Sequence, residues 1–242
     1  MSGLRIWTLA VLFYGAFWLW YVGVPRPLTR EEIDAHMATL AASQIDSTPE
    51  QRARVRAFLE ADDGREFFML NLVRVNPGPV AAPGSSEPRD ARSVLDGYTR
   101  HFMPALFRRA GHPAFFGRAA GGYLEQWNVA PDPGWSFGAA IRYRSRRDMI
   151  ELVVDPRFAN AHEYKAAAIG TTFAFPTSPG FVMIGPKIWM GLVLALAAAL
   201  AQLALGRSRR MGKASSIQEN PARIESHGSG RNHGGDGDRT HL

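Results

Sequence analysis

Cysteine is absent from all 242 residues, which excludes disulfides, thiol catalysis and cysteine-ligated zinc. A glycine-rich phosphate loop between a strand and a helix is also missing, as is a nucleophile elbow; Gly121-Gly122 lies between two predicted strands and indicates a turn. The charge balance is only mildly basic, at +6, and several of these charges fall near the C-terminus. We therefore expect no nucleic-acid partner.

Charge is absent from residues 6–24 (IWTLAVLFYGAFWLWYVGV), and residues 188–205 (IWMGLVLALAAALAQLAL) contain Gln202 as their only strongly polar side chain. A helix rises about 1.5 Å per residue and the hydrocarbon core of a bilayer is about 30 Å thick, so each stretch is long enough to span it. Both are apolar all round, unlike a helix on the surface of a soluble core. The sequence predicts two transmembrane helices that hold a central domain in a lipid bilayer.

Arg207, Arg209, Arg210 and Lys213 follow the second stretch, with no acidic residue before Glu219. Short flanks rich in Lys and Arg stay in the cytoplasm, so both termini are predicted to be cytoplasmic. The protein is then expected in a bacterial inner membrane, with its central domain periplasmic or extracellular. Two alternatives are a cleaved signal peptide in place of the first helix and a reversed topology with a cytoplasmic domain.

Residues 25–65 are predicted to form a membrane-proximal helical segment. Thr29 can cap a helix that begins with acidic residues. The tetrapeptide from Ser47 to Glu50 is interpreted as a capping box, with Pro49 in the first turn of a second helix. Residues 206–242 are predicted to be a disordered basic tail because, from Met211 onward, they are rich in Gly, Ser, Asn and His.

Residues 66–180 are predicted to form one α+β domain. Apolar, branched and aromatic runs predict strands at 66–75, 113–118, 123–127, 136–143 and 171–175. Helical spacing covers 91–110, where Pro104 should kink or split the helix, and two later helices cover 146–154 and 157–168. Residues 76–88 are predicted to be an irregular loop. This order predicts a ferredoxin-like domain with helices on one face of an antiparallel sheet. The other face is expected to be covered by the sheet of a second copy in a homodimer.

Tyr98 and His101 lie three residues apart on one predicted helix and therefore share a face. Histidine is readily recruited for proton transfer near neutral pH, so this pair is the candidate catalytic pair and also a candidate for ligand binding. In the alternative interpretation Tyr98 belongs to the core and His101 is a partly exposed helix residue.

Three further side chains are candidate ligand contacts. Asn71 interrupts an apolar strand and either orients a ligand or satisfies a neighbouring loop. Arg142 binds a carboxylate, faces solvent or pairs with Glu125. Trp127 is either a ligand clamp or an aromatic residue of the core or dimer interface.

The histidines give no persuasive metal site. His101, His112 and His162 include no pair at the i, i+4 spacing that supports a metal site on a helix. His227, His233 and His241 are scattered through the tail, where a solvated state is the simpler interpretation. We expect no metal and no cofactor.

The central segment, roughly 66–176, resembles a widespread bacterial domain of unknown function, the DUF-thirteen-thirty-like group. The matching positions are residues 68–74 (FMLNLVR), Tyr98, Pro104, Gly111, 141–146 (IRYRSR), Met149, 155–158 (DPRF) and 165–168 (KAAA). The chain departs from the group at Arg144, where Pro is common, and at Glu163-Tyr164, where His is often found.

The resemblance implies the fold of the dimeric α/β barrels, which include small cofactor-free monooxygenases. The leading hypothesis is a membrane protein whose domain binds a small apolar or aromatic molecule. The alternatives are a non-catalytic module for dimerisation or partner docking and, by family analogy alone, a monooxygenase-like enzyme. Whether the protein is an enzyme is left open by the sequence.

Overall fold

The computed structural model describes residues 3–43, 48–180 and 185–218. The chain divides into two units. One unit comprises Met1–Tyr14 with Ile188–Leu242, and the other is the continuous segment Gly15–Lys187.

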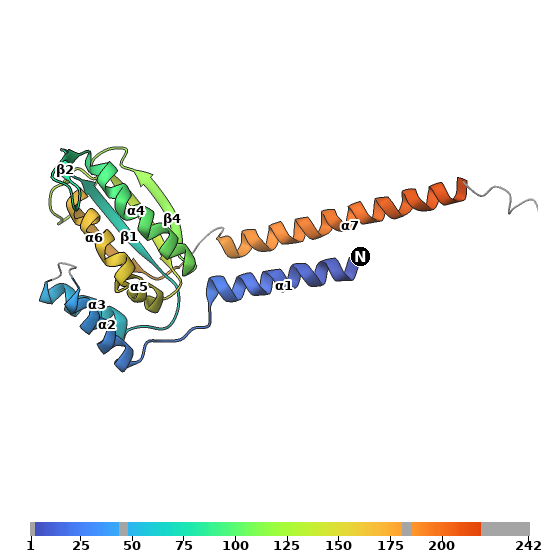
Figure 1. Cartoon of the computed structure of the whole chain (residues 1–242), viewed down its shortest axis with the longest axis horizontal. Coiled ribbons are helices and arrows are strands. Elements are labelled where there is room, and N and C mark those ends of the chain that lie inside the picture. Colours follow the sequence, from blue (N-terminus) through green and yellow to red (C-terminus); the bar gives the residue numbers. More distant parts are fainter. Residues whose placement is uncertain (1–2, 44–47, 181–184, 219–242) are drawn as a thin grey trace, which may run out of the picture. The chain divides into compact units, whose positions relative to one another are not determined.

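The helices and strands follow the chain in a simple order (Figure 1). They are α1 (Gly3–Val22), α2 (Arg30–Ala42), α3 (Pro49–Glu60), β1 (Phe67–Val75), β2 (Val80–Ala81), β3 (Pro88–Arg89), α4 (Ala91–Arg108), β4 (His112–Arg118), β5 (Phe137–Tyr143), α5 (Arg146–Val153), α6 (Pro156–Ala168), β6 (Ile169–Thr177) and α7 (Pro186–Gln218).

The main sheet has four antiparallel strands in the order β4-β5-β1-β6. The first strand of the domain therefore lies between the third and the fourth, which is the split β-α-β order predicted from the sequence. Helices α4, α5 and α6 lie on one face of this sheet (Figure 1). The result is an α+β domain with helices segregated to one face of an antiparallel sheet.

Part of the opposite face of the sheet is apolar and open. Phe115 of β4 and Phe173 of β6 are 61% and 53% exposed, and Leu72 and Phe175 are also exposed. Alternation along each strand puts these side chains on the side away from the helices, since the residues next to them in sequence face the helices. The bare face expected from the sequence is thus present in the described chain.

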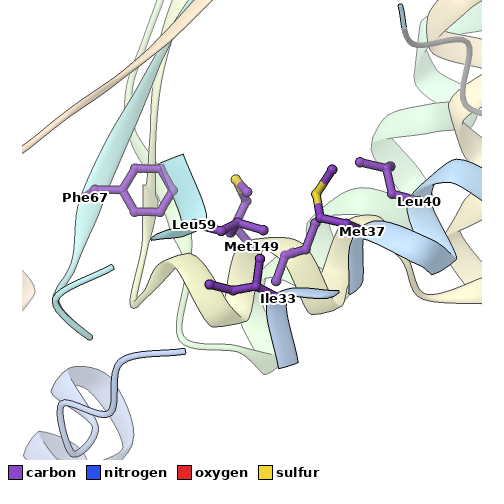
Figure 2. Packing of buried hydrophobic residues seen from close by; sticks show 7 residues of the cluster. Ile33, Met37, Leu40, Leu59, Phe67 and Met149 are labelled. Atoms are coloured by element: carbon purple, nitrogen blue, oxygen red, sulfur yellow. The ribbon is translucent and has the colours of Figure 1, made fainter. Parts of the chain in front are cut away.

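Helices α2 and α3 pack beneath one end of the domain and share a core with β1 and α5. The buried members are Ile33, Met37, Leu40, Leu59, Phe67, Met149 and Ile150 (Figure 2). Thr29 caps α2 through a complete capping box with Glu32. In α3 the cap is Thr48, whose partner is Gln51, and not the predicted Ser47–Glu50 pair. Pro49 explains this shift because proline is favoured at the first helical position, directly after the cap.

Helices α1 and α7 are long and apolar enough to cross a membrane, and only 6% of the apolar window of each is buried. The indole Nε1 of Trp7 donates a 2.7 Å hydrogen bond to the Oε1 atom of Gln202, the single strongly polar side chain of the second apolar stretch. Tyr14 lies close to Gly191 further along the same two helices, which therefore run antiparallel. Helix α7 continues to Gln218, so the start of the predicted disordered tail is helical; residues 219–242, with His227, His233 and His241, lie outside the described residues.

Three local predictions differ from the structure. Residues 123–127 form no strand, because the connection between β4 and β5 closes through side-chain bonds such as Tyr123 N–H to the Asp132 carboxylate at 2.9 Å. The predicted loop at 76–88 contains the two-residue strand β2, paired with β3. Helix α4 is not split at Pro104, since buried residues on both sides of the proline, Phe102 and Leu106, hold one helical face against the domain.

Candidate functional site

A cavity of about 620 Å³ lies between the sheet and helices α4, α5 and α6. Strand β1 contributes Met69, Asn71 and Val73, and β5 contributes Ile141 and Tyr143, among others. These positions alternate along their strands, so their side chains share the face toward the helices. The cavity is thus a space between the sheet and the helices that their side chains do not fill and that opens to solvent beside exposed lining residues such as Arg92 and Arg118.

One end of this cavity is lined by polar side chains and the other by apolar ones, and the strand pairing shows which residues lie at each end. Phe137 pairs with Arg118, and Val75 pairs with Ile169, at one end of the sheet. The polar lining residues Arg92, Asp96, Ser136 and Lys165 gather toward this end, since they lie on the first turns of α4, beside Phe137 and on the last turns of α6. The opposite end is apolar and is lined by Phe102, Pro113, Tyr143, Met149 and Leu152.

Tyr98 stands at the centre of an aromatic group between α4 and α6. Its ring stacks on Phe102 with a centroid distance of 5.2 Å and lies 5.4 Å from the ring of Phe158. His162 meets the Tyr98 ring edge-on at 6.3 Å. Burial raises the pKa of the Tyr98 hydroxyl well above its ordinary value, so it remains a neutral phenol that can donate a hydrogen bond.

His162 is a neutral imidazole with an unused nitrogen. Its Nδ1 atom is buried and has no hydrogen-bond partner in the described protein. Burial, together with the positive charge of Lys165, lowers the pKa of His162 to about 4. Buried polar groups normally have a partner, so this nitrogen is an exception inside the packing between α6 and its neighbours.

Lys165 lies one helical turn beyond His162 and also lines the cavity. Its ammonium nitrogen is 5.6 Å from the centre of the Tyr98 ring. Burial lowers the pKa of Lys165. No carboxylate forms an ion pair with it among the residues that the structure describes.

The cavity brings together two of the five predicted site residues, Asn71 and Tyr98. The amide nitrogen of Asn71 donates to the carbonyl of Met69 at 2.8 Å, which leaves the amide oxygen for other contacts. His101 instead lies on the exposed side of α4, with its Nδ1 2.8 Å from the Gly97 carbonyl. Trp127 is 76% exposed in the β4–β5 connection and lies outside the cavity.

Arg142, the fifth predicted residue, points to the opposite face of the sheet and is only 1% exposed. Its partner is Glu66, at 2.6 Å, and not the suggested Glu125. The guanidinium also donates to the carbonyl oxygens of Ala110 at 2.6 Å and Tyr21 at 3.0 Å. Lys187 completes the group with a 2.6 Å ion pair to Glu66. This Arg142 cluster ties the segments at both ends of Gly15–Lys187 to the sheet.

The candidate histidines are dispersed. His112 lies with its Nε2 2.7 Å from the Tyr21 hydroxyl, His101 is exposed, and His162 lines the cavity. Within the described ranges no group of three His, Asp or Glu side chains is placed to hold a metal ion.

Sequence reasoning missed His162 and Lys165 as partners of Tyr98. Their i, i+3 spacing on one predicted helix was a usable signal for a shared face. Which face of α6 turns toward the cavity depends on how α6 packs against α4. Helical spacing alone does not specify this packing.

Solved structures similar to this chain come from two bacteria. The RPA0582 protein of unknown function from Rhodopseudomonas palustris has a TM-score of 0.45 at 25% identity, over 58% of this chain and 99% of that chain. The methylated RPA0582 protein gives the same TM-score and identity, over 60% and 97%. A dimeric protein of unknown function and ferredoxin-like fold from Bacteroides fragilis NCTC 9343 has a TM-score of 0.29 at 11% identity, over 46% and 94%.

No protein-family model matches the chain, and no curated protein matches it. The resemblance to the DUF-thirteen-thirty-like group therefore stays a prediction. The similar structures are described as proteins of unknown function, so no activity is carried over from them.

Proposed function

We propose that the protein is anchored in a membrane by α1 and α7 and binds a small apolar or aromatic molecule in the cavity of its ferredoxin-like domain. The observation that carries this proposal is the cavity of about 620 Å³ between sheet and helices. Ligand sites typically enclose roughly 300–1,000 Å³, are mostly apolar and hold a few convergent polar groups. Asn71, Tyr98, His162 and Lys165 are such groups.

The test is binding of 2-naphthamide, a neutral aromatic probe, to the full chain in lipid nanodiscs, with empty nanodiscs as the blank. Ala139 lines the cavity from β5, so the Ala139→Phe variant fills part of it. Ala166→Phe places the same side chain on the exposed surface of α6 and is the matched control. We expect saturable binding that Ala139→Phe abolishes and Ala166→Phe preserves; binding unaffected by Ala139→Phe would contradict the proposal.

The membrane part of the proposal rests on the two exposed apolar helices and on the hydrogen bond between Trp7 and Gln202. A polar side chain that lies inside the hydrocarbon core of a bilayer is expected to form a hydrogen bond with a neighbouring helix. The basic residues after the second stretch favour a cytoplasmic C-terminus and a periplasmic or extracellular domain. The chain has no cysteine, so a Ser86→Cys variant gives a single labelling site in the domain. We expect an impermeant maleimide to label it in intact cells; labelling only after permeabilisation would reverse the topology.

The open sheet face favours a second candidate function, homodimerisation through the domain. Phe115 and Phe173 expose aromatic surface on strands of one flat face, and large exposed apolar patches mark interaction sites. We expect Phe173→Asp to weaken a dimer detected by native mass spectrometry of the full chain in detergent micelles. Phe107→Asp, on the exposed surface of α4, is the control that should leave the dimer intact. An unchanged dimer in Phe173→Asp would exclude this face as the interface.

A further inference from the structure

The charges that line the cavity are unbalanced. Arg92, Arg118 and Lys165 contribute three cationic groups, whereas Asp96 is the one acidic side chain among the described lining residues. Arg92, Arg118 and Asp96 are exposed, so water screens them. Lys165 is the cation that is partly buried, and it is therefore the one whose charge most needs a partner.

Lys165 has no such partner within the described protein. No carboxylate, including that of Asp96 on the facing helix, forms an ion pair with it. Its ammonium group instead lies over the face of the Tyr98 ring. An ammonium group held in a largely apolar cavity without a counter-ion is costly, and a bound anion would remove that cost.

A hydrogen-bond donor lies beside Lys165. The ring of Tyr98, which the ammonium group of Lys165 contacts, also lines the cavity. Its hydroxyl stays a neutral phenol and can donate a hydrogen bond to an anion held by Lys165.

The remainder of the cavity fits an apolar body. Phe102, Tyr143, Met149 and Leu152 line the end away from the cationic residues. A molecule that fills both ends therefore has an apolar part and one polar group close to Lys165.

We propose that the cavity selects apolar molecules that carry one anionic oxygen group, a carboxylate or a phenolate, with Lys165 as its ionic partner and the Tyr98 hydroxyl as a hydrogen-bond donor to it. This inference rests on the proposed ligand-binding function. The anion pairs with the lysine and accepts from the Tyr98 hydroxyl, and the apolar body occupies the opposite end of the cavity. Aromatic acids and short fatty acids share this chemistry.

The experiment compares each acid with its neutral amide on the full chain in zwitterionic nanodiscs, with empty nanodiscs subtracted. One arm uses 2-naphthoate and 2-naphthamide, and the other uses decanoate and decanamide. A charge-assisted hydrogen bond contributes enough to favour the acid by about tenfold to a hundredfold. The arm with the larger preference identifies an aromatic or an aliphatic source for the ligand.

The variant Lys165→Met should remove the preference for the acid while the affinity for the amide is kept, which also shows that the cavity is folded. Lys165→Arg retains the charge and should retain the preference. Arg100→Met removes an exposed cation from α4 and is the matched control.

Equal binding of acid and amide by the unmodified chain would overturn the anionic class and leave the proposed function in place. A preference that persists in Lys165→Met would overturn the role of this lysine. Failure of acids and amides alike to bind would overturn both the inference and the proposed function.

Discussion

Lowering the pH from 7 to 5 should destabilise the domain through one residue, His162. Its imidazole is held neutral in the folded protein, where burial and Lys165 lower its pKa from 6.5 to about 4. In the unfolded chain the same group takes up a proton near pH 6.5. Between pH 6.5 and 4 the unfolded state therefore binds more protons than the native state, and the free energy of unfolding falls as the pH falls.

The magnitude follows from the two pKa values. At pH 5 the unfolded histidine is almost fully protonated and the native one almost fully neutral, so the loss relative to pH 7 is about 2 kcal/mol. His162 retains some contact with solvent through the cavity, which makes this figure an upper bound. Below pH 4 both states are protonated, and this contribution no longer changes.

The assay is urea unfolding of the full chain in detergent micelles at pH 7 and pH 5, followed by near-ultraviolet circular dichroism. Other carboxylates and histidines also titrate in this range, so the informative quantity is the difference between variants. His162→Phe removes the titrating group from the cavity and should reduce the pH dependence by about 2 kcal/mol. His101→Phe makes the same change on the exposed side of α4 and is the control. A pH dependence that is identical in the original chain and in His162→Phe would refute the reasoning.

Two further changes test the packing around the domain, both by the urea midpoint at pH 7. Arg142→Met removes the buried partner of Glu66 and should lower the free energy of unfolding by about 3–5 kcal/mol. Arg157→Met, at a side chain that is 81% exposed, is the control and should leave the free energy of unfolding almost unchanged. Equal losses in the two variants would contradict the structural role of Arg142. Gly64 has a φ of +70°, and a Cβ there would lie 2.5 Å from the backbone nitrogen of a neighbouring segment, whereas Gly84 has a φ of +74° in open space. Gly64→Ala should therefore destabilise the domain by roughly 1–3 kcal/mol more than Gly84→Ala, and a smaller difference would show that the segment can move aside.

Local chemistry accounts for the parts of the fold that the sequence predicted well. Thr29 followed by Glu32 specifies a helix start by itself, and the structure has a complete capping box there. The apolar run that becomes β1 predicts a buried strand, and in the sheet β1 lies between β5 and β6. Residues 123–127 have a similar composition but no neighbouring strand to pair with, and composition does not reveal whether a partner exists.

The candidate site was predicted only where strand or helix periodicity sufficed. Asn71 and Tyr98 face the cavity as alternation and helical spacing indicate. His101, by the same spacing, was expected beside Tyr98, yet it lies on the exposed side because the face of α4 around Phe102 turns inward. His162 and Lys165 depend on the packing of α6 against α4, which no local pattern specifies.

Strand β5 has two roles within the segment Gly15–Lys187. Ile141 and Tyr143 face the cavity, and Arg142, between them, faces the other way. Arg142 and Arg144 donate hydrogen bonds to the carbonyl oxygens of Tyr21 and Trp20, which lie at the C-terminal end of α1, where helix carbonyls have no partners within the helix. Alternation along a strand keeps neighbouring side chains on opposite faces, so one short strand both lines the cavity and anchors the end of the first apolar helix. A molecule bound in the cavity as proposed would contact the same strand that holds this helix end, with a single peptide unit separating each cavity residue from Arg142.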